Sequence, residues 1–425
     1  MELISRYSNS SRLMLYRIFL IICFLLTATT GFSQQAWTFF NTANSPLPEN
    51  SVRCIASTPN GTVWIGTDYG LAAYDGISWN VYNTMNSGIP DNSIRSLLID
   101  GNVIWVGTFM GGLARFDGTS WNIYNTINSF IPDDFVRSLA RDTAGNIWVG
   151  TIGGLGLFDG VTWTIFNMNN TPLLSNNISG LWSDSIGTIV CTINGGVGFY
   201  NNGSWQHFTI GNSNLPDNSS LGTIRDNAGV PWFSTPANGL SAYVGGIQFL
   251  TFSTITSGIA SNSTTGLAYR QQVDEIWLGS IDEGLIRKSG LNFTNYGTAN
   301  GSLPDNVVQC VHVDSQDIVW AGMQTGGVVR LDPDLLMNIT SLESSFEAFV
   351  YPNPAADFIK FDFESSEPVE VLVFDGLGSK VMEKRFEAHT SPINLGVSNL
   401  NAGRYQVLIR QGGRIYTAGF MKADY

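Results

Sequence analysis

Three arginines are the side chains best suited to hold a charged ligand. Arg53, Arg95 and Arg137 are spaced 42 residues apart, and each directly follows a valine or an isoleucine. Guanidinium groups bind carboxylate and sulfate with paired hydrogen bonds, so three of them brought together predict an anion site. The alternative is that they pair with acidic side chains of neighbouring loops, such as Asp91 and Asp133. Later copies of the same sequence pattern carry Ser179, Leu221, Thr265 and Gln309 at this position.

A second group of candidates lies in short variable segments between two apolar runs. They are Asp68, Tyr69, Phe109, Met110, Ile152, Gly153, Asn194, Asp282, Glu283, Gln324 and Thr325. Aromatic rings beside carboxylates and amides suit recognition of a sugar or a peptide by stacking and hydrogen bonding. The other interpretation is that these loops simply tolerate variation.

Residues for catalysis or metal binding do not gather in the sequence. His207, His312 and His389 are far apart, and no two have the spacing of metal ligands. No nucleophile elbow, phosphate-binding loop or calcium loop is present. The sequence therefore predicts no catalytic residue, no metal site and no cofactor.

The cysteines after the N-terminal region are Cys54, Cys191 and Cys310, too few for a disulfide framework. Cys54 and Cys310 hold equivalent positions in the first and last copies of a repeat. They predict either a disulfide or two free thiols, because equivalent positions on adjacent strands can exceed the ~7 Å limit between Cα atoms.

These candidates are carried by a repeat of about 42 residues. A Trp-bearing position recurs at Trp64, Trp105, Trp148, Val190, Trp232, Trp277 and Trp320. Each copy contains four strand-like segments, which in the third copy are residues 136–142, 146–151, 155–160 and 162–167. Four antiparallel strands every 40 to 45 residues are typical of a β-propeller blade, whereas solenoid repeats are shorter or need periodic leucines. The tryptophans are then expected to fill the space between blades.

The two ends of the repeat predict how the ring closes. Residues 36–41 match the fourth strand of a blade, but no other strand precedes them. The seventh copy lacks its fourth strand. The N-terminal strand should therefore complete the last blade, which gives seven blades and removes exposed sheet edges.

Composition excludes some partners. The 425-residue chain has a net charge of -13, with 43% hydrophobic and 13% charged residues. Residues 34–345 contain 23 acidic and 10 basic side chains, which would repel phosphate backbones and anionic membranes. Nucleic acid is a poor candidate partner, and almost no helix is expected.

The N-terminus has the pattern of a secretory signal peptide at residues 1–33. Arg12 and Arg17 precede the apolar run 18–26, and small residues lead to a cleavage site near Ser33. The run is shorter than the ~20 residues needed to span a bilayer, so we expect no transmembrane segment in the mature chain.

The C-terminal region departs from the repeat after Asp332. Residues 336–345 are expected to be a linker between a propeller at 34–335 and a further domain at 346–425. In that domain, apolar runs are separated by Pro-Asn-Pro, Asp-Gly and Asn-Ala-Gly turns. This pattern predicts a small antiparallel β-sandwich.

Both parts resemble known families. The motif NIWVGT followed by Gly-Gly-Leu and an aromatic-Asp-Gly, with a preceding Pro-Asp-Asn, resembles the two component regulator propeller repeat. That resemblance implies a binding scaffold; the chain shows no kinase or regulator segment. The Tyr-Pro-Asn-Pro opening at Tyr351, the Asp-Gly-x-Gly-x-x-Val segment at Asp375 and the terminal lysine resemble the type A C-terminal sorting domain of the type IX secretion system. This resemblance implies that the secretion machinery is a partner and that the protein reaches the surface of a Bacteroidetes-type cell.

The expectation is an all-β protein: a seven-bladed β-propeller followed by a small C-terminal β-sandwich. Its expected function is that of a secreted or cell-surface, non-catalytic module that binds a glycan or a peptide. Two alternatives stay open. One is a propeller enzyme such as a polysaccharide lyase or lactone hydrolase, and the other is a structural surface component.

Overall fold

The computed structural model describes residues 36–336, 345–347, 350–361, 368–375, 380–387, 393–411 and 414–423. The predicted signal peptide at 1–33, most of the predicted linker and His389 lie outside the described residues. The chain divides into two compact units, one of which is Ala36–Leu336.

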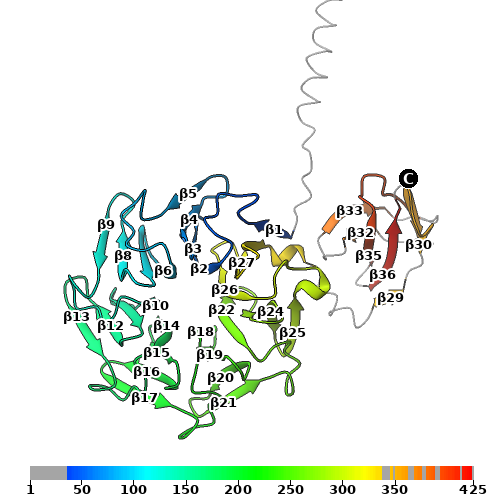
Figure 1. Ribbon diagram of the computed structural model, residues 1–425. Coiled ribbons are helices and arrows are strands. Elements are labelled where there is room, and N and C mark those ends of the chain that lie inside the picture. Colours follow the sequence, from blue (N-terminus) through cyan, green and yellow to red (C-terminus); the bar gives the residue numbers. More distant parts are fainter. Residues whose placement is uncertain are drawn as a thin grey trace, which may run out of the picture. The chain divides into compact units, whose positions relative to one another are not determined.

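The first unit contains seven four-stranded antiparallel sheets, as the repeat predicts (Figure 1). The first three blades contain β2 (Val52–Ser57), β3 (Val63–Thr67), β4 (Gly70–Tyr74) and β5 (Trp79–Tyr82); β6 (Ile94–Asp100), β7 (Val103–Thr108), β8 (Leu113–Phe116) and β9 (Trp121–Tyr124); and β10 (Val136–Arg141), β11 (Ile147–Thr151), β12 (Leu155–Phe158) and β13 (Trp163–Phe166).

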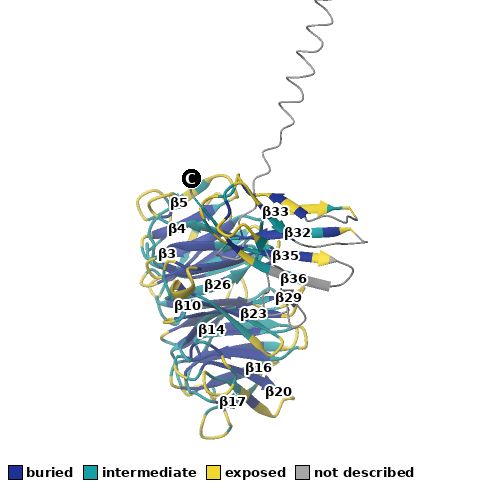
Figure 2. Ribbon diagram, turned by 90° about the vertical axis from the view of Figure 1, so that its right-hand side faces the viewer, coloured by how far each residue is buried: buried dark blue, intermediate teal, exposed yellow. Residues whose placement is uncertain are grey.

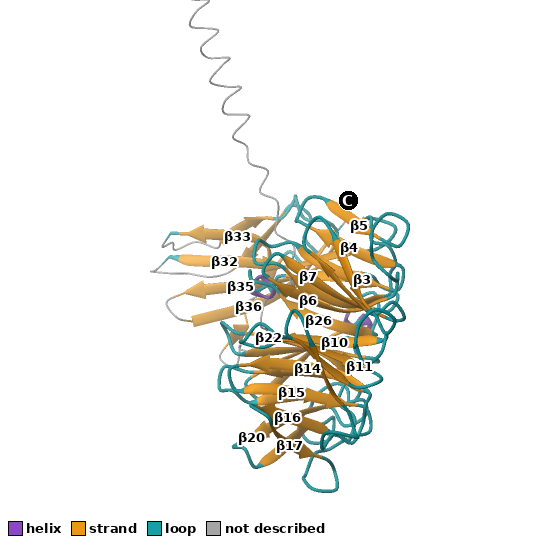
Figure 3. Cartoon of the chain, turned by 90° about the vertical axis from the view of Figure 1, so that its left-hand side faces the viewer, coloured by secondary structure: helices purple, strands orange, loops and turns teal. Residues whose placement is uncertain are grey.

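The next three blades contain β14 (Ile178–Asp184), β15 (Gly187–Thr192), β16 (Val197–Asn201) and β17 (Ser204–Phe208); β18 (Gly222–Arg225), β19 (Pro231–Ser234), β20 (Leu240–Val244) and β21 (Gln248–Phe252); and β22 (Thr264–Arg270), β23 (Glu275–Ser280), β24 (Leu285–Ser289) and β25 (Asn292–Tyr296). The seventh contains β26 (Val308–Val313), β27 (Val319–Met323), β28 (Val328–Leu331) and β1 (Trp37–Phe40). Within the described residues the helical segments are two 3-10 turns, η1 (Thr298–Asn300) and η2 (Pro333–Leu335) (Figure 3).

The N-terminal strand closes the ring, as predicted. β1 pairs antiparallel with β28, and Trp37 lies opposite Leu331. The innermost strand of each blade contacts that of the next, from β2 through β26 and back to β2. A second tie joins the sixth blade to the closure, because Arg270 Nη2 donates to Asp334 Oδ1 in η2 at 2.7 Å.

Aromatic rings fill the space between blades, as expected. Between the first and second blades, Trp64 stacks on Tyr82, which contacts Phe116, and Phe116 stacks on Trp121. The tryptophans of the central strands are at most 7% exposed. Burial of these strands is continuous through the propeller, whereas the loops are exposed (Figure 2).

The fourth blade corrects one sequence assignment. The repeat comparison puts Val190 in the Trp position. In the third blade, Trp148 lies opposite Ala140 and Leu157. The residue with the matching register in the fourth blade is Ile189, which lies opposite Trp182 and Phe199. The sequence comparison was wrong by one residue. In this blade the tryptophan is Trp182 of the innermost strand β14, and the usual Trp position in β15 holds the smaller Ile189.

A recurrent side-chain bond fixes the loops that join successive blades. Eight residues into each loop an Asn or Asp side chain accepts a hydrogen bond from the backbone near the loop's start, as Asn92 Oδ1 does from Thr84 N at 2.9 Å. Equivalent bonds occur at Asn50, Asp134, Asn176, Asn218, Asn262 and Asn306. This bond explains why the loop sequence is nearly repeated.

The second unit has two sheets around one core. One sheet has the order β29 (Ser345–Glu347), β36 (Arg414–Lys422), β35 (Gly403–Gln411), β32 (Val369–Phe374) and β33 (Lys380–Phe386); the other has β30 (Val350–Tyr351), β31 (Phe358–Phe361) and β34 (Ile393–Gly396). Ile359 and Leu395 of the smaller sheet share a core with Val371 and Val407 of the larger. The sandwich prediction holds, but β29 and β36 run parallel, so the expectation of a wholly antiparallel sandwich was wrong.

Candidate functional site

The three arginines line the central channel of the propeller. A cavity of about 600 Å³ lies within the ring of innermost strands, and its lining includes Arg53, Arg95, Arg137, Ser179, Leu221, Thr265 and Gln309. In most blades this position falls in a register shift at the start of the innermost strand, such as that between Val52 and Cys54. A β-bulge of this kind redirects a side chain, here into the channel. The seven residues at this repeat position therefore form a ring around one cavity.

Asp68 is the acidic partner of the first two arginines. Arg53 Nη2 donates to Asp68 Oδ2 at 2.6 Å, and Arg95 Nη2 lies 3.3 Å from Asp68 Oδ1. Partial burial alone would raise the pKa of Asp68, but hydrogen bonds from Arg53 and Ser51 and the arginine charges outweigh it and lower the pKa. Asp68 is therefore an anion that is already paired with Arg53 and Arg95.

The acids proposed as partners from sequence have other roles. Asp91 accepts hydrogen bonds from the backbone N–H groups of Ser93 and Met110, and Asp133 accepts one from that of Phe135. They fix loops, because an Asp side chain can accept a hydrogen bond from the backbone N–H two residues further on. The pairing interpretation was right in kind for Arg53 and Arg95 but named the wrong acids.

Arg137 is bonded to a neutral side chain. Its Nη1 donates to Asn177 Oδ1 at 2.8 Å, and its guanidinium lies 5.7 Å from the centre of the Phe135 ring. Burial and the charge of Arg95 lower the pKa of Arg137. Arg95 also keeps a buried Nε without a hydrogen-bond partner. Arg53 and Arg95 thus share one carboxylate and Arg137 bonds none, which leaves a local excess of positive charge.

Aromatic and apolar side chains surround this charge. The guanidinium of Arg95 lies 5.0 Å from the centre of the Phe109 ring, and Phe109 meets Phe135 edge-on at 4.6 Å. Tyr69 is 66% exposed and Met110 is 73% exposed. These two predicted site residues present their side chains to solvent beside the channel mouth.

The other predicted site residues lie on the same face over later blades. The backbone N–H and the side-chain oxygen of Asn194 both bond the Ser219 hydroxyl, and Glu283 Oε2 accepts a long hydrogen bond of 3.4 Å from Asn295. Asp282 is exposed, Gln324 lines the central cavity, and Thr325 bonds Asp305. These residues do not join the arginine cluster in one contact network.

Sequence reasoning missed several members of the cluster. Asn177, Phe135 and Gln309 contact the arginines, the last accepting from Arg53 Nη1 at 2.6 Å. Ser51 and Ser93 donate to Asp68. A signal was available, because these residues lie in the same loops or at the same ring position as the candidates.

The opposite mouth of the channel holds a second cavity of about 480 Å³. It is lined by His312, Trp182, Asp226 and Tyr269, among others. Ser57 Oγ lies within hydrogen-bond distance of His312 Nε2, at 2.8 Å. Burial lowers the pKa of His312 to about 4 against the charge of Asp314, so the ring is neutral at pH 7. No three potential metal ligands lie together in the part of the chain that the structure describes.

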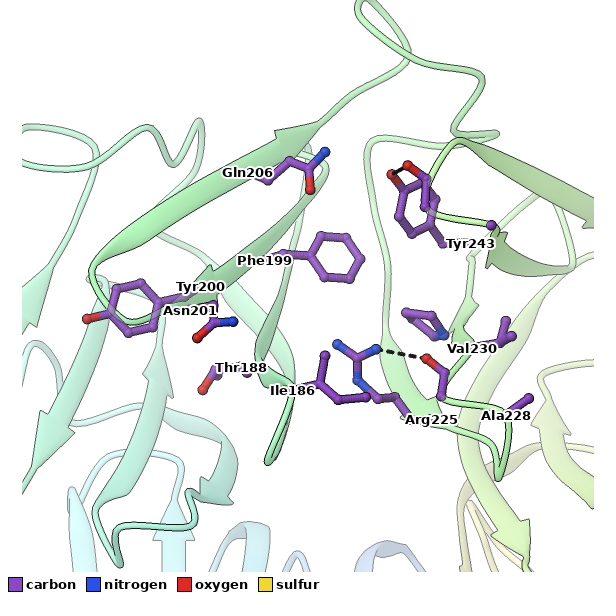
Figure 4. Close-up of a pocket in the computed structure, with 15 residues that line it drawn as sticks. Ile186, Thr188, Phe199, Tyr200, Asn201, Gln206, Arg225, Ala228, Val230 and Tyr243 are labelled. Atoms are coloured by element: carbon purple, nitrogen blue, oxygen red, sulfur yellow. Dashed lines mark hydrogen bonds between the residues drawn. The ribbon is translucent and has the colours of Figure 1, made fainter.

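A groove of about 450 Å³ opens between the fourth and fifth blades (Figure 4). Phe199 and Tyr243 face each other across it, and Arg225 donates from Nη1 to Gly229 O at 2.9 Å. The corresponding groove between the third and fourth blades is lined by Trp148 and is about 290 Å³. Ile189, which replaces this tryptophan in the fourth blade, packs with Phe233 and Tyr243 and is not part of the groove lining.

Cys54, Cys191 and Cys310 are all free thiols. Burial raises the pKa of Cys191 and of Cys310 to about 12, so both are protonated and unreactive at neutral pH. The disulfide alternative is not realised in this structure.

Family models match parts of both units. Residues 46–69 and 131–153 match the two component regulator propeller model, and residues 349–422 match the secretion system C-terminal sorting domain. The chain combines propeller repeats of this type with a sorting domain. The sorting domain indicates secretion and attachment at the outer-membrane surface. No helix among the described residues is long and apolar enough to cross a membrane.

Solved structures support the fold at low sequence identity. The extracellular domain of the hybrid two component system BT3049 from B. thetaiotaomicron is 17% identical with a TM-score of 0.60, covering 90% of this chain and 57% of that one. PorZ, a surface component of the type IX secretion system of Porphyromonas gingivalis, is 15% identical with a TM-score of 0.52, covering 91% and 61%. Virginiamycin B lyase from Staphylococcus aureus is 15% identical with a TM-score of 0.54, covering 69% of this chain and 98% of that one.

This chain thus spans less than two thirds of the length of the first two structures. A search of curated protein sequences gives no match.

Proposed function

We propose that this propeller is a non-catalytic binding module that holds a glycan or a peptide at the channel mouth formed by Arg53, Arg95 and Arg137. The observation that carries the proposal is the charge imbalance at this mouth. Of the three half-buried arginines, Arg53 and Arg95 share Asp68, and Arg137 has a neutral partner. A ligand carboxylate or sulfate would complete the set, because buried guanidinium groups are stabilised by charged acceptors.

The cavity is suited to receive part of a ligand. Its volume of about 600 Å³ lies within the range of small-molecule sites, and residues from all seven blades line it. The half opposite the arginines is neutral or apolar, with Leu221, Thr265 and Ile281 in the lining. A ligand with an anionic group and an uncharged body fits this division.

An enzymatic function would need a convergent acid, base or nucleophile at one mouth. The cavity at the arginine mouth has no histidine in its lining. The Ser57 and His312 pair lies at the other mouth, where the nearby Asp314 accepts a hydrogen bond from the indole N–H of Trp320. The binding proposal uses every charged group of the arginine mouth and needs no catalytic group.

The test is binding by the full-length protein to glycan and peptide arrays that include carboxylated and sulfated members. The parent is expected to bind anionic members, and a variant with Arg53→Ala, Arg95→Ala and Arg137→Ala to lose at least about tenfold in affinity, the scale of one lost charged contact. A control variant with Arg115→Ala and Arg141→Ala removes one half-buried and one exposed arginine outside the mouth. Equal binding by the parent and the triple variant would overturn the proposal.

A further inference from the structure

The loops around the arginine mouth expose large apolar side chains over the first three blades. They are Tyr69, Met85, Phe109, Met110, Ile127, Phe130 and Ile152, which we name the apolar face. Met85 is 92% exposed, Ile127 is 93% exposed and Phe130 is 81% exposed. Side chains of this size are ordinarily covered when they gather, so an exposed group of them marks an interaction surface.

The loops of the apolar face lie on one side of the propeller. Phe109 N donates to Ser93 O at 2.9 Å, and Met110 N donates to Asp91 Oδ2 at 2.8 Å, so the loop after β7 is bonded to the loop after β5. The arginines stand beside them, with Arg95 over the Phe109 ring and Arg137 over the Phe135 ring. Phe109 therefore joins the apolar face to the arginine mouth, and Met85, Ile127 and Phe130 belong to the blade-to-blade loops on the same side of the propeller.

The chemistry of this surface favours a peptide over a glycan. Methionine and isoleucine offer neither a flat ring for a sugar to stack on nor a hydrogen bond for its hydroxyl groups. Methionine, aromatic residues and arginine are instead the side chains enriched in protein interfaces. Flexible methionines also adapt to different apolar side chains.

Charge determines what the peptide must carry. Between residues 34 and 345 the chain holds 23 acidic and 10 basic side chains, so an acidic segment is repelled by most of the propeller. At the arginine mouth the sign is reversed, because Asp68 is held by Arg53 and Arg95 while Arg137 bonds Asn177. An acidic side chain or a terminal carboxylate is attracted at this one mouth and fixes the register of the segment there.

Resting on the proposed function, we infer that the surface binds an extended segment of a partner protein in which a carboxylate is flanked by apolar side chains. The carboxylate lies between Arg95 and Arg137, and the apolar side chains cover Met85, Met110 and Ile127. No covalent step is involved.

The test uses the full-length protein and a synthetic array of leucine-rich octapeptides. Each acidic peptide is matched by a copy with Asp changed to Asn and Glu to Gln, and a tetragalacturonate is included as the anionic glycan probe. Dissociation constants are measured by fluorescence anisotropy at low and high salt. The acidic peptides should bind more tightly than their amide copies, and more weakly as salt rises.

Two variants and a matched control separate the contributions. Arg137→Gln should weaken binding of the acidic peptides about tenfold or more, and Met85→Ser with Ile127→Ser should do the same. The control is Ile77→Ser with Val161→Ser. These residues are 91% and 85% exposed on blades one and three, but in the turns of the opposite face, so this variant should bind like the parent.

The outcomes distinguish this inference from the proposed function. Arginine-dependent binding of tetragalacturonate without binding of any peptide overturns the peptide inference and leaves the binding module. Peptide binding that survives either test variant overturns the inference as well. Binding of neither probe class, with the parent folded by thermal melting, overturns both.

Discussion

At the channel mouth, Asp68 determines how much positive charge the arginines keep. It comes from the loop after β3, while its partners come from β2 and β6, so one carboxylate joins two blades. Arg137 lies one blade further on, out of its reach, and bonds Asn177. The asymmetry of the site therefore arises from where a single acid stands in the repeat.

His312 is a residue whose ionisation should affect stability. Its pKa is lowered to about 4 by burial, whereas an unfolded histidine titrates near 6.5. Between these values the unfolded chain binds a proton that the folded protein does not, so stability falls as the pH is lowered from 6.5 to 4. Because the side chain is only partly buried, we expect a loss of about 1–2 kcal/mol.

Urea unfolding at pH 7 and pH 4.5 measures this effect. His312→Gln should show a smaller loss between the two pH values than the parent does. The exposed-loop variant Ile77→Ser serves as the control, with the loss of the parent. If His312→Gln and the parent lose the same stability, another group is responsible for the pH dependence.

Residue positions that recur could be predicted, and those set by a neighbouring loop could not. The grouping of Arg53, Arg95 and Arg137 followed from the period alone, because this repeat position lines the channel in all seven blades and lies at a bulge in most of them. The partnership with Asp68 did not follow, because it depends on how the loop after β3 folds back over β2. Sequence proximity favoured Asp91, which instead bonds the backbone of Ser93.

At the scale of elements, the strand order and the closure could be read from the repeat, but the register of one strand could not. Aligning the repeats by their period can misplace a residue by one position. In β15 a shift of one position changes which neighbouring blade the side chain faces, because successive side chains of a strand point to opposite sides. Ile189 packs toward the fifth blade with Phe233, while Val190 packs toward the third with Trp148.

Closure by β1 should be a large contributor to stability. Trp37 is 3% exposed, and its ring lies 5.4 Å from that of Tyr296 in the sixth blade. Its indole N–H has no hydrogen-bond partner among the described residues, so its contribution is packing. Trp37→Ala should destabilise the propeller by roughly 3–5 kcal/mol, the usual cost of removing a buried Trp side chain.

Denaturant unfolding of the full-length protein measures this cost. Thr38→Ala is the matched control, because it changes the same strand at a half-buried position. It should leave the free energy of unfolding within about 0.5 kcal/mol of that of the parent. An unchanged midpoint for Trp37→Ala would show that β1 does not hold the ring closed.

At the scale of the whole molecule, one unit carries the proposed binding site and the other the domain for export. The propeller carries the arginine mouth, and residues 349–422 match the sorting domain. The fold of both units was predicted from sequence, since alternating apolar runs and turns are explicit in it. The parallel pairing of β29 with β36 was not, because a three-residue strand has no periodicity to detect.

Removal of residues 351–425 should stop export at the periplasm of a cell with a type IX secretion system. Surface proteolysis and cell fractionation compare the truncated chain with the full chain. Full-length Arg137→Gln is the control, because it alters the propeller and keeps the sorting domain. Undiminished surface exposure of the truncated chain would contradict the role given to this domain.

The pairing of β1 with β28 has a kinetic consequence. Trp37 and Leu331 are neighbours across a strand pair but nearly 300 residues apart in the chain, whereas the other pairs of the ring are hairpins. Bringing such distant ends together costs roughly 5 kcal/mol of chain entropy, so this contact forms after the hairpins. Until then β28 is an open template for a second chain. The strong negative charge of the propeller keeps such half-closed chains apart while the ring is still incomplete.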